Sequence, residues 1–520
     1  MTIMNMRHIH RVAVAALAFG GAVACNNDKL TELNRNPNSP EEVPASSIFT
    51  TAERNTVSRW LGNGYDLRGL EWVAQHLAEV QYPDEDAYKR LLAAAATTPA
   101  WFDNPYVSEL EDLRQVIMRG LNAKDPGIYA PALVLRTLGF SYLTNTFGDI
   151  PYFSALAGDS VGASLSPKYD AQKDIYADFF KTLTDASTAF GTASNSLGKA
   201  DPLYGGDPAK WKKFANSLRL RLAMQLANVD AATASAQITA ALAGGVFTSN
   251  ADMAVFQWPG DGVYNNPWSG NFISRDDHRM SQTLMNVMLA SNDPRIPIFA
   301  QPTVADPTKY AGMPNGLTQA TAQPYFNTSS RPGKIFWPPA NSAAVSGGTG
   351  NAQPTFVMTY AEVAFLEAEA AARSLGGLTP SQAQGFYNAA ITASLNQWGV
   401  TDAAKISAFL SNPNIAYKGG VEGQDQITTQ EWVALYTDGG QAWTLWRRTC
   451  QPTTLKPGPA AIINTVPRRM QYSTNEYLVN ADQVTAALGQ MGGPDEFTTR
   501  MYWDKSPTAA PTYTTGCGTR

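Results

Sequence analysis

The chain has 520 residues, 44% of them hydrophobic, and a formal net charge of −5. This length and composition are enough for a large buried core and exclude a disordered polypeptide, and the acidic balance argues against a nucleic-acid partner. No apolar run reaches the roughly 18 residues that a membrane-spanning helix needs, so we expect no such helix in the mature chain.

The N-terminus has the organisation of a secretory signal. Basic residues precede an apolar stretch at positions 12–19, and small residues then lead directly to Cys25. The small residues satisfy an A-x-A signal-peptidase site and, together with the cysteine, also resemble a bacterial lipobox. We predict the second route, with a lipoprotein signal peptide over 1–24 and a lipidated tether over 25–47. The tether is rich in Asn and Pro, and the lipid on Cys25 would attach the protein to a membrane.

Helical patterns follow along the chain. Residues 48–82 are predicted to be helical in two pieces, separated by Gly62 and Gly64. Periodicity predicts a generic scaffold of stacked helical hairpins, because the fixed positions of a tetratricopeptide signature are missing. The expected pairs of helices are 110–121 with 128–147, 170–190 with 208–228, 360–375 with 381–398, and 428–437 with 440–448.

Several residues indicate where these helices begin. Asp207 followed by Pro208 is typical of an N-cap with proline in the first turn, and Asp170 is a second N-cap candidate. The helix that Asp207 begins repeats apolar residues on one face, and Arg219 and Arg221 fall outside that face. Capping boxes are expected at Ser381 with Gln384 and at Thr428 with Glu431.

Residues 246–356 interrupt the helical pattern with many Pro, Gly and Asn residues and many aromatic ones. Long irregular segments in a compact protein are usually functional or disordered, and aromatic residues argue against disorder. We predict an ordered, ligand-facing layer in which flat aromatic faces stack on sugar rings. The alternative is that the rings only fix the loops to the scaffold. The predicted ligand-binding residues are Trp258, Tyr264, Trp268 and Trp337 in this layer, with Tyr65 and Tyr82 as secondary candidates.

Five strings give the chain a resemblance to one family. They are FSYLTNTFGDIPY (140–152), NSLRLRLAMQL (216–226), TYAEVAFLEAEAAAR (359–373), WTLWRRT (443–449) and PRRMQYSTNEYLVN (467–480). In this order they resemble the SusD/RagB nutrient-binding outer-membrane lipoproteins of glycan and peptide uptake loci, over essentially the whole mature chain. The resemblance implies a mostly α fold. Four tetratricopeptide-like helix pairs would form a superhelical scaffold, and a loop-rich ligand-binding layer would pack on it.

The resemblance also implies a location and a partner. The protein would be anchored in the outer membrane by its lipid, face the cell exterior, and deliver its ligand to a SusC-like TonB-dependent transporter. The chain would then comprise the signal peptide and tether, a first part of the helical scaffold over 48–245, the ligand-binding layer over 246–356, and a second part of the scaffold with the C-terminal tail over 357–520.

Motifs for catalysis are scarce. Outside the signal the histidines are His76 and His278, without metal-ligand spacing, and the sequence lacks the H-E-x-x-H, G-x-S-x-G and phosphate-loop motifs. Glycoside hydrolysis, which needs two carboxylates, is the enzymatic alternative. Asp276 and Asp277 are the most conspicuous acidic pair. Because adjacent side chains diverge, these two do not naturally face one sugar bond. Helix capping or pairing with Arg275 or Arg279 is their expected role.

A short acidic run, Asp84, Glu85 and Asp86, follows Tyr82 and Pro83. We interpret it as a solvated turn, with a calcium-binding loop and a set of ligand acceptors as alternatives. The sequence is therefore compatible with a structural calcium ion, and no cofactor is expected.

Two arginine pairs, Arg447 with Arg448 and Arg468 with Arg469, have the chemistry of anion recognition. They also lie beside predicted helix ends, where arginine can bond to terminal carbonyls and to nearby acids. We predict this scaffold role for both pairs.

Two cysteines, Cys450 and Cys517, remain if Cys25 carries the lipid. An even number of cysteines in an exported, oxidising compartment favours a disulfide between them. Two separate free thiols are the alternative.

These observations predict a non-enzymatic cell-surface lipoprotein that binds nutrient oligomers. An oligosaccharide is the favoured ligand, and a peptide is the alternative within the same family. An exported glycoside hydrolase is the alternative outside it.

Overall fold

The computed structural model describes residues 43–504 and Cys517, except for residues 96, 161 and 341. It divides into two units, residues 1–44 and residues 45–520, and the second holds every described helix and strand. The predicted signal peptide and Cys25 lie outside the described residues. Of the helices in the described part, none is both long enough and apolar enough to cross a membrane.

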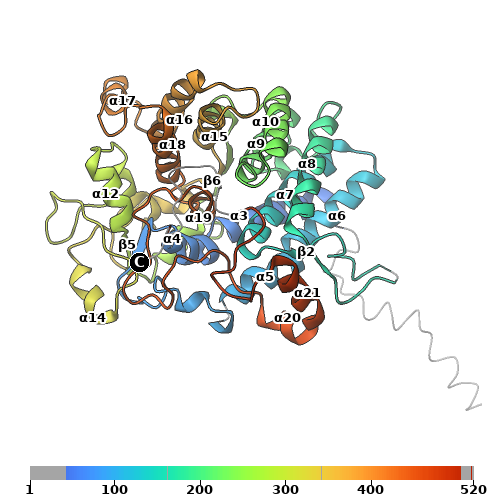
Figure 1. The fold of residues 1–520 in the computed structure, drawn as a ribbon, viewed down its shortest axis with the longest axis horizontal. Helices are drawn as coiled ribbons and strands as arrows, with labels where there is room; N and C mark the ends of the chain where they lie inside the picture. The colour runs from blue at the N-terminus through green and yellow to red at the C-terminus, as the bar shows by residue number, and fades with distance from the viewer. Residues whose placement is uncertain (1–42, 96, 161, 341, 505–516, 518–520) are drawn as a thin grey trace, which may run out of the picture. The chain divides into compact units, whose positions relative to one another are not determined.

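The fold is mostly helical, with short antiparallel strand pairs (Figure 1). In the N-terminal half the helices are α3 (Ala45–Trp60), the π-helix η1 (Asn63–Leu70), α4 (Glu71–Val73), α5 (Thr97–Val107), α6 (Glu109–Asn122), α7 (Pro126–Phe147), α8 (Gln172–Ala189), α9 (Pro208–Gln225) and α10 (Ala231–Gly244). In the C-terminal half they are α11 (Pro267–Asn271), α12 (Gln282–Ala290), α13 (Ile296–Phe299), α14 (Gln319–Ala322), α15 (Tyr360–Ala372), α16 (Ala383–Gln397), α17 (Ala403–Leu410), α18 (Gly420–Ala434), α19 (Gly439–Thr449), α20 (Thr474–Val479) and α21 (Ala481–Met491). The strands are β1 (Leu77–Glu79) with β5 (His278–Met280), β2 (Ile150–Pro151) with β3 (Tyr169–Asp170), and β4 (Ala254–Phe256) with β6 (Thr355–Met358).

Each predicted helix pair is present as two helices in contact: α6 with α7, α8 with α9, α15 with α16, and α18 with α19. In Figure 1, α6 to α10 form one group and α15, α16 and α18 form another. Contacts between α9 and α15 join the two groups into a continuous scaffold. The sequence did not predict α10, which packs on α9. α3 begins at Ala45, inside the predicted tether, and packs on α6 and α7.

Distant strings of the sequence meet at the C-terminal end of α7. Gly148 ends this helix with a φ of +92°, in agreement with its predicted role. The carbonyl of Asn145 accepts a hydrogen bond from Arg447 Nη1 (2.7 Å), and the carbonyl of Phe147 accepts one from Arg469 Nε (3.0 Å). Both arginines are buried. They satisfy carbonyls that the helix itself leaves unbonded, which confirms the predicted scaffold role.

Buried ion pairs join the scaffold helices. Arg221 of α9 donates to both carboxylate oxygens of Glu362 of α15, at 2.5 and 2.6 Å. Arg448 of α19 donates to both oxygens of Glu369, also of α15, at 2.5 and 2.7 Å. The expectation that Arg221 lies outside the buried face was wrong. Glu362 neutralises its charge, so the guanidinium can be buried between two helices.

The predicted helix starts are only partly correct. Asp207 caps α9 as expected, with its carboxylate accepting the N–H groups of the first turn. Asp170 lies in β3 and bonds to the backbone after β2, so it does not cap α8. The capping box before α16 begins at Thr379 rather than at Ser381, and Thr428 lies inside α18. Several polar residues lie near each start, and local spacing does not decide which of them becomes the cap.

Residues 77–79, which were expected to be helical, form β1. In its pairing with β5, Leu77 lies opposite Met280 and Glu79 lies opposite His278. The helical prediction failed because the strand partner is far along the chain and leaves no local signal. As a consequence, the segment that carries Tyr82 lies against the segment that leads into β5.

A disulfide joins Cys450 to Cys517, the pairing expected from the sequence. Their Cα atoms are 5.7 Å apart, and the two residues are separated by 67 positions. Cys450 directly follows α19, and Cys517 packs against the main hydrophobic core. The bond therefore ties the C-terminal tail to the scaffold.

Candidate ligand-binding site

Four of the six predicted ligand-binding aromatics are buried. The exposed fraction of the residue is 6% for Trp258, 3% for Trp268, 0% for Trp337 and 2% for Tyr65. The prediction that these rings are exposed was therefore wrong. A ring that is packed on both faces offers no surface to a sugar.

The buried tryptophans fix the loop-rich segment to its surroundings. Trp337 stacks on Phe272 with 4.4 Å between ring centroids, and its indole N–H donates to a backbone carbonyl (3.0 Å). Trp268 packs edge-on against Tyr436, which lies between α18 and α19 (6.0 Å). The indole N–H of Trp258 donates to a threonine hydroxyl (2.9 Å). These contacts correspond to the alternative considered for the sequence, in which the rings have a structural role.

Tyr82 remains exposed and is held in place by the residues around it. The residue is 53% exposed, and the guanidinium of Arg275 lies 4.7 Å from the centre of its ring. Glu79, the last residue of β1, accepts the backbone N–H of Tyr82 (3.1 Å) and so fixes the turn that carries it. With the cation on one face, the ring presents an ordered surface to solvent.

Tyr264, 46% exposed, is the second accessible ring. It lies in a turn in which Asp261 accepts the N–H groups of Val263 and Tyr264 (2.9 and 2.8 Å). These backbone hydrogen bonds lower the pKa of the Asp261 carboxyl. The guanidinium of Arg54 lies 5.4 Å from the centre of the Tyr264 ring. Tyr82 and Tyr264 thus share one arrangement, an exposed ring with an arginine beside it.

A cavity of about 350 Å³ lies between α3, η1 and α5. Arg59 of α3, Arg68 of η1 and Arg90 line it, and we call it the arginine pocket. Tyr65 and Trp101 also line it, and their ring centroids are 5.1 Å apart. Three segments of the sequence contribute the arginines, so no single motif indicated the pocket.

Glu85 connects the arginine pocket with Tyr82. Its Oε1 accepts a hydrogen bond from Arg68 Nη2 (2.7 Å) and another from Arg90. Its Oε2 lies 3.5 Å from Nη2 of Arg275, the arginine beside Tyr82. The Glu85 side chain is 1% exposed. A buried carboxylate therefore organises three cations whose side chains reach solvent.

A second buried acidic group lies behind Arg275. One ligand atom from each of Glu79, Asp277 and His278 lies within 4.8 Å of the others. Burial, with the charges of Asp277 and Glu85, raises the pKa of Glu79 well above its ordinary value. Burial also raises the pKa of Asp277, but His278 and Arg275 outweigh it and hold that pKa below the usual range. Arg275 supplies positive charge to this group, because its Nη2 contacts Asp277 and lies 3.9 Å from Glu79.

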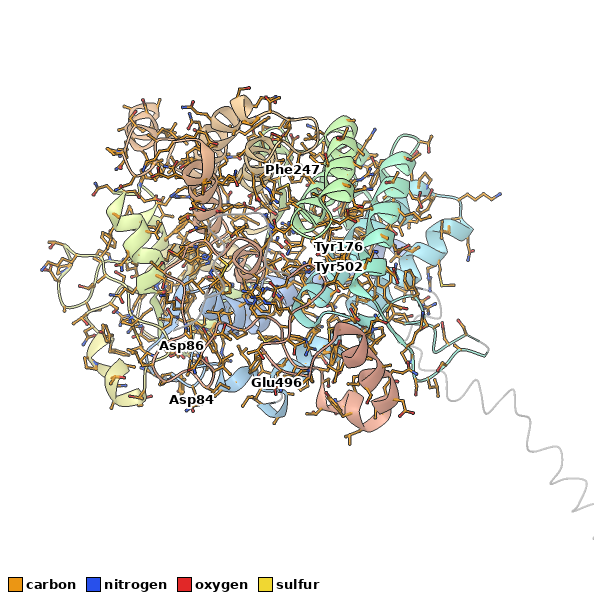
Figure 2. The ribbon with its side chains drawn as sticks, in the orientation of Figure 1. Asp84, Asp86, Tyr176, Phe247, Glu496 and Tyr502 are labelled. Atoms are coloured by element: carbon orange, nitrogen blue, oxygen red, sulfur yellow. A yellow bond between two sulfur atoms is a disulfide. The ribbon has the colours of Figure 1, made fainter. Side chains whose placement is uncertain are left out.

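The acidic run at 84–86 is not the expected solvated turn, because Glu85 and Asp86 are buried. The exposed carboxylate of Asp84 pairs with Lys89 (2.6 Å), Glu85 pairs with arginines, and the buried Asp86 accepts the N–H of Glu79 (3.1 Å). Figure 2 shows Asp84 at the edge of the molecule and Asp86 further in. Burial raises the pKa of Asp86 to about 7. Three different sets of partners argue against a calcium loop at this position.

The acidic pair Asp276 and Asp277 is engaged in ion pairs, as predicted. Asp276 accepts two hydrogen bonds of 2.6 Å from Arg331, and Asp277 contacts Arg275 and His278. The two carboxylates have different partners, so they do not face one glycosidic bond.

A larger cavity of about 770 Å³ lies between α13, α17 and the segment that follows α12. Its lining includes Phe409, Asp402 and Lys405, but none of the predicted ligand-binding residues. Asp402 caps α17 through the N–H groups of Ala404 and Lys405. The arginine pocket has more cations and aromatic rings in less volume, and we treat it, with Tyr82, as the candidate site.

Comparisons with family models and with solved structures both give matches over most of the chain. A family model described as "Starch-binding associating with outer membrane" matches residues 37–473. A solved structure named as a chitin-binding protein is 27% identical, with a TM-score of 0.74, and the match covers 89% of this chain and 100% of that one. Among curated proteins, none is significantly similar.

Two further solved structures share the fold. A SusD homolog from Bacteroides uniformis is 24% identical with a TM-score of 0.73, and the match covers 89% of this chain and 100% of that one. A chitin-binding SusD homolog from Flavobacterium johnsoniae is 22% identical with a TM-score of 0.69, and the match covers 88% and 98%. At these identities the likeness establishes the fold alone.

Proposed function

This chain belongs to the SusD-like family of starch-binding proteins associated with the outer membrane, and on that premise we propose that it captures oligosaccharides at the cell surface without cleaving them. The exposed Tyr82 ring, which Arg275 and Glu85 link to the arginine pocket, carries the proposal for this chain. An aromatic face stacks on the apolar face of a sugar, and nearby guanidinium groups donate to its hydroxyls.

Two observations support a glycan over other ligands. The 27% identical solved structure, matched over its whole length, is named as a chitin-binding protein. Tyr82 and Tyr264 are exposed rings held in ordered turns, the feature that sugar stacking requires. A peptide remains the alternative ligand that the binding test below distinguishes.

The proposed role is binding rather than hydrolysis. A glycosidase needs two carboxylates about 5 to 10 Å apart that both face the scissile bond. Asp276 and Asp277, the pair most conspicuous in the sequence, are each held by arginine or histidine partners.

The location and partner belong to the same proposal. A lipid on Cys25 would anchor the protein in the outer membrane with its binding face to the exterior. Captured glycan would then pass to a SusC-like TonB-dependent transporter in that membrane. The family description, which includes association with the outer membrane, supports this arrangement.

Titration calorimetry with malto-, chito- and other oligosaccharides, with peptides of similar length alongside, tests the function. We expect saturable binding of at least one oligosaccharide and no change in its chain length after incubation. Binding of peptides alone would contradict the glycan proposal, and shortened products would contradict a role without catalysis.

Removing the Tyr82 ring is expected to weaken glycan binding without unfolding the protein. Tyr82→Ala should cost roughly 2 kcal/mol of binding free energy, a roughly thirty-fold loss of affinity, if the ring is a central stacking residue. Because the ring is exposed, the melting temperature should change little. Tyr264→Ala should weaken glycan binding by the same amount or less. Calorimetry and thermal unfolding of each variant measure the two quantities.

Phe153→Ala is the matched control, because Phe153 is also 53% exposed but lies after β2. It should bind like the wild type. Trp337→Ala should instead lose about 3 to 5 kcal/mol of stability, since it empties a buried site. Unchanged affinity in both tyrosine variants would remove these rings from the site.

Membrane attachment is predicted to depend on Cys25, which lies outside the described residues. Cys25→Ala should release the protein from the membrane fraction, since the thiol that accepts the lipid is gone. Metabolic labelling with fatty acid measures lipidation, and fractionation measures membrane attachment. A wild-type protein that is unlabelled and soluble would contradict the prediction.

A further inference from the structure

The arginine pocket has more cations than a neutral sugar requires. Arg59, Arg68 and Arg90 line one cavity of about 350 Å³, and each comes from a different element. The fractional exposure of their side chains is 21%, 26% and 45%. All three side chains therefore reach solvent and line the same cavity.

The acids that pair with these arginines are hidden behind them. Glu85 accepts from Arg68 and Arg90, and its side chain is 1% exposed. Glu109 accepts from Arg59, and its side chain is 0% exposed. Three cations thus face the cavity over two buried carboxylates. The surface that a ligand meets is positive, although the chain as a whole carries a formal charge of −5.

Donor groups remain for a ligand. A guanidinium has five N–H groups in a planar fork. Arg68 bonds to Glu85 through Nη2. Arg90 bonds to Glu85 through Nη1. Arg68 and Arg90 each use one η nitrogen for Glu85, so their remaining η N–H groups are available to an acceptor in the cavity.

We propose that the arginine pocket binds the carboxylate of an acidic sugar, so that the ligand is an oligosaccharide containing uronic acid residues. This inference rests on the proposed function and narrows its substrate class. A guanidinium fork matches a planar carboxylate, and Arg68 with Arg90 can supply it while Glu85 holds both in place. The rings of Tyr65 and Trp101 form the apolar part of the lining. A pocket of this volume suits a sugar residue rather than a long polypeptide segment.

The test uses matched ligands on the full chain purified after export. Calorimetry compares trigalacturonate and a hyaluronan tetrasaccharide with the methyl-esterified form of each. Esterification keeps the ring and removes the charge, so we expect binding of an acid form and at least about tenfold weaker binding of its ester. Binding of the acid should also weaken as the salt concentration rises.

Arg90→Gln is the informative variant, because Arg90 is the most exposed of the three and Arg68 still holds Glu85. It should lower affinity for the acid form about tenfold and affinity for the ester by much less. Lys173→Gln on α8 removes one exposed charge elsewhere and should have no effect. Arg68→Lys retains the charge without the fork and should also bind weakly. Thermal unfolding of each variant checks that it is folded.

The outcomes separate the two proposals. Equal binding of acid and ester, or binding of neutral chito-oligosaccharides alone, would overturn the acidic-sugar inference and leave the glycan function standing. Binding of no oligosaccharide would overturn both. Tighter binding of triglutamate than of either acidic sugar would assign the pocket to acidic peptides and overturn the inference.

Discussion

Arg221→Met is expected to lower the free energy of unfolding by about 3 to 5 kcal/mol, because it leaves a buried carboxylate without its cation. Arg221 donates to both oxygens of Glu362, and the two side chains are 4% and 2% exposed. This pair joins α9 to α15 and thus the two groups of scaffold helices. The loss should therefore appear as cooperative destabilisation of the scaffold.

Denaturant unfolding of the wild type and the variant measures the difference. Arg219→Met is the matched control: Arg219 lies on the same helix, is partly exposed, and bonds to Gln237 (2.7 Å) rather than to an acid. It should cost less than about 1 kcal/mol. Replacing Glu362 by Gln together with Arg221→Met should recover much of the loss, since no unpaired charge remains. A single variant as stable as the wild type would show that the pair does not hold the helices together.

The helical pairs were predictable because their signals are local. Apolar residues at helical spacing identify a buried face, and short connections identify neighbours. Asp207 and Gly148 also act as predicted, since a cap and a positive φ depend on the nearest residues. The partners of β1 and of Asp170 were not predictable, because each is set by a distant or non-helical segment.

The aromatic residues show why exposure was harder to predict. Trp258, Trp268 and Trp337 lie among turn formers, which suggested open loops. In the folded chain, the loops pack on the scaffold, and polar groups within the protein accept the indole N–H of Trp258 and Trp337. Tryptophan combines a large apolar area with one donor, so a buried site with an acceptor suits it as well as a ligand does. Sequence spacing contains no information about that acceptor.

The arginines show a related error. Arg221 was expected outside the buried face, yet a partner on another helix allows it to be buried. The pocket arginines Arg59, Arg68 and Arg90 were not identified, because α3, η1 and the segment after Glu85 meet only in three dimensions. The run of acids beside Tyr82 was the available signal. A buried acid in this run needs cations as partners. The sequence does not show which arginines supply them, and the structure does.

The disulfide is expected to contribute about 4 kcal/mol to stability. In the chain-entropy model, a bond that closes a loop of this length removes that much conformational freedom from the unfolded chain. Cys450 and Cys517 are separated by 67 positions. The closed loop contains Arg469 and Trp503, which donate hydrogen bonds to Phe147 and Asn145 at the C-terminal end of α7. Loss of the bond should therefore affect the unfolding of the scaffold as well as the tail.

Cys517→Ser is the preferred variant, because it leaves Cys450 in place at a positive φ of 59° after α19. With Cys25 replaced in both chains, denaturant unfolding should show a loss of up to about 4 kcal/mol relative to the disulfide-bonded chain. Dithiothreitol should lower the stability of the bonded chain to that of the variant and leave the variant itself unchanged. If the two chains unfold at the same denaturant concentration without reductant, the loop-closure account is wrong, and the buried arginines alone hold the C-terminal segment on α7.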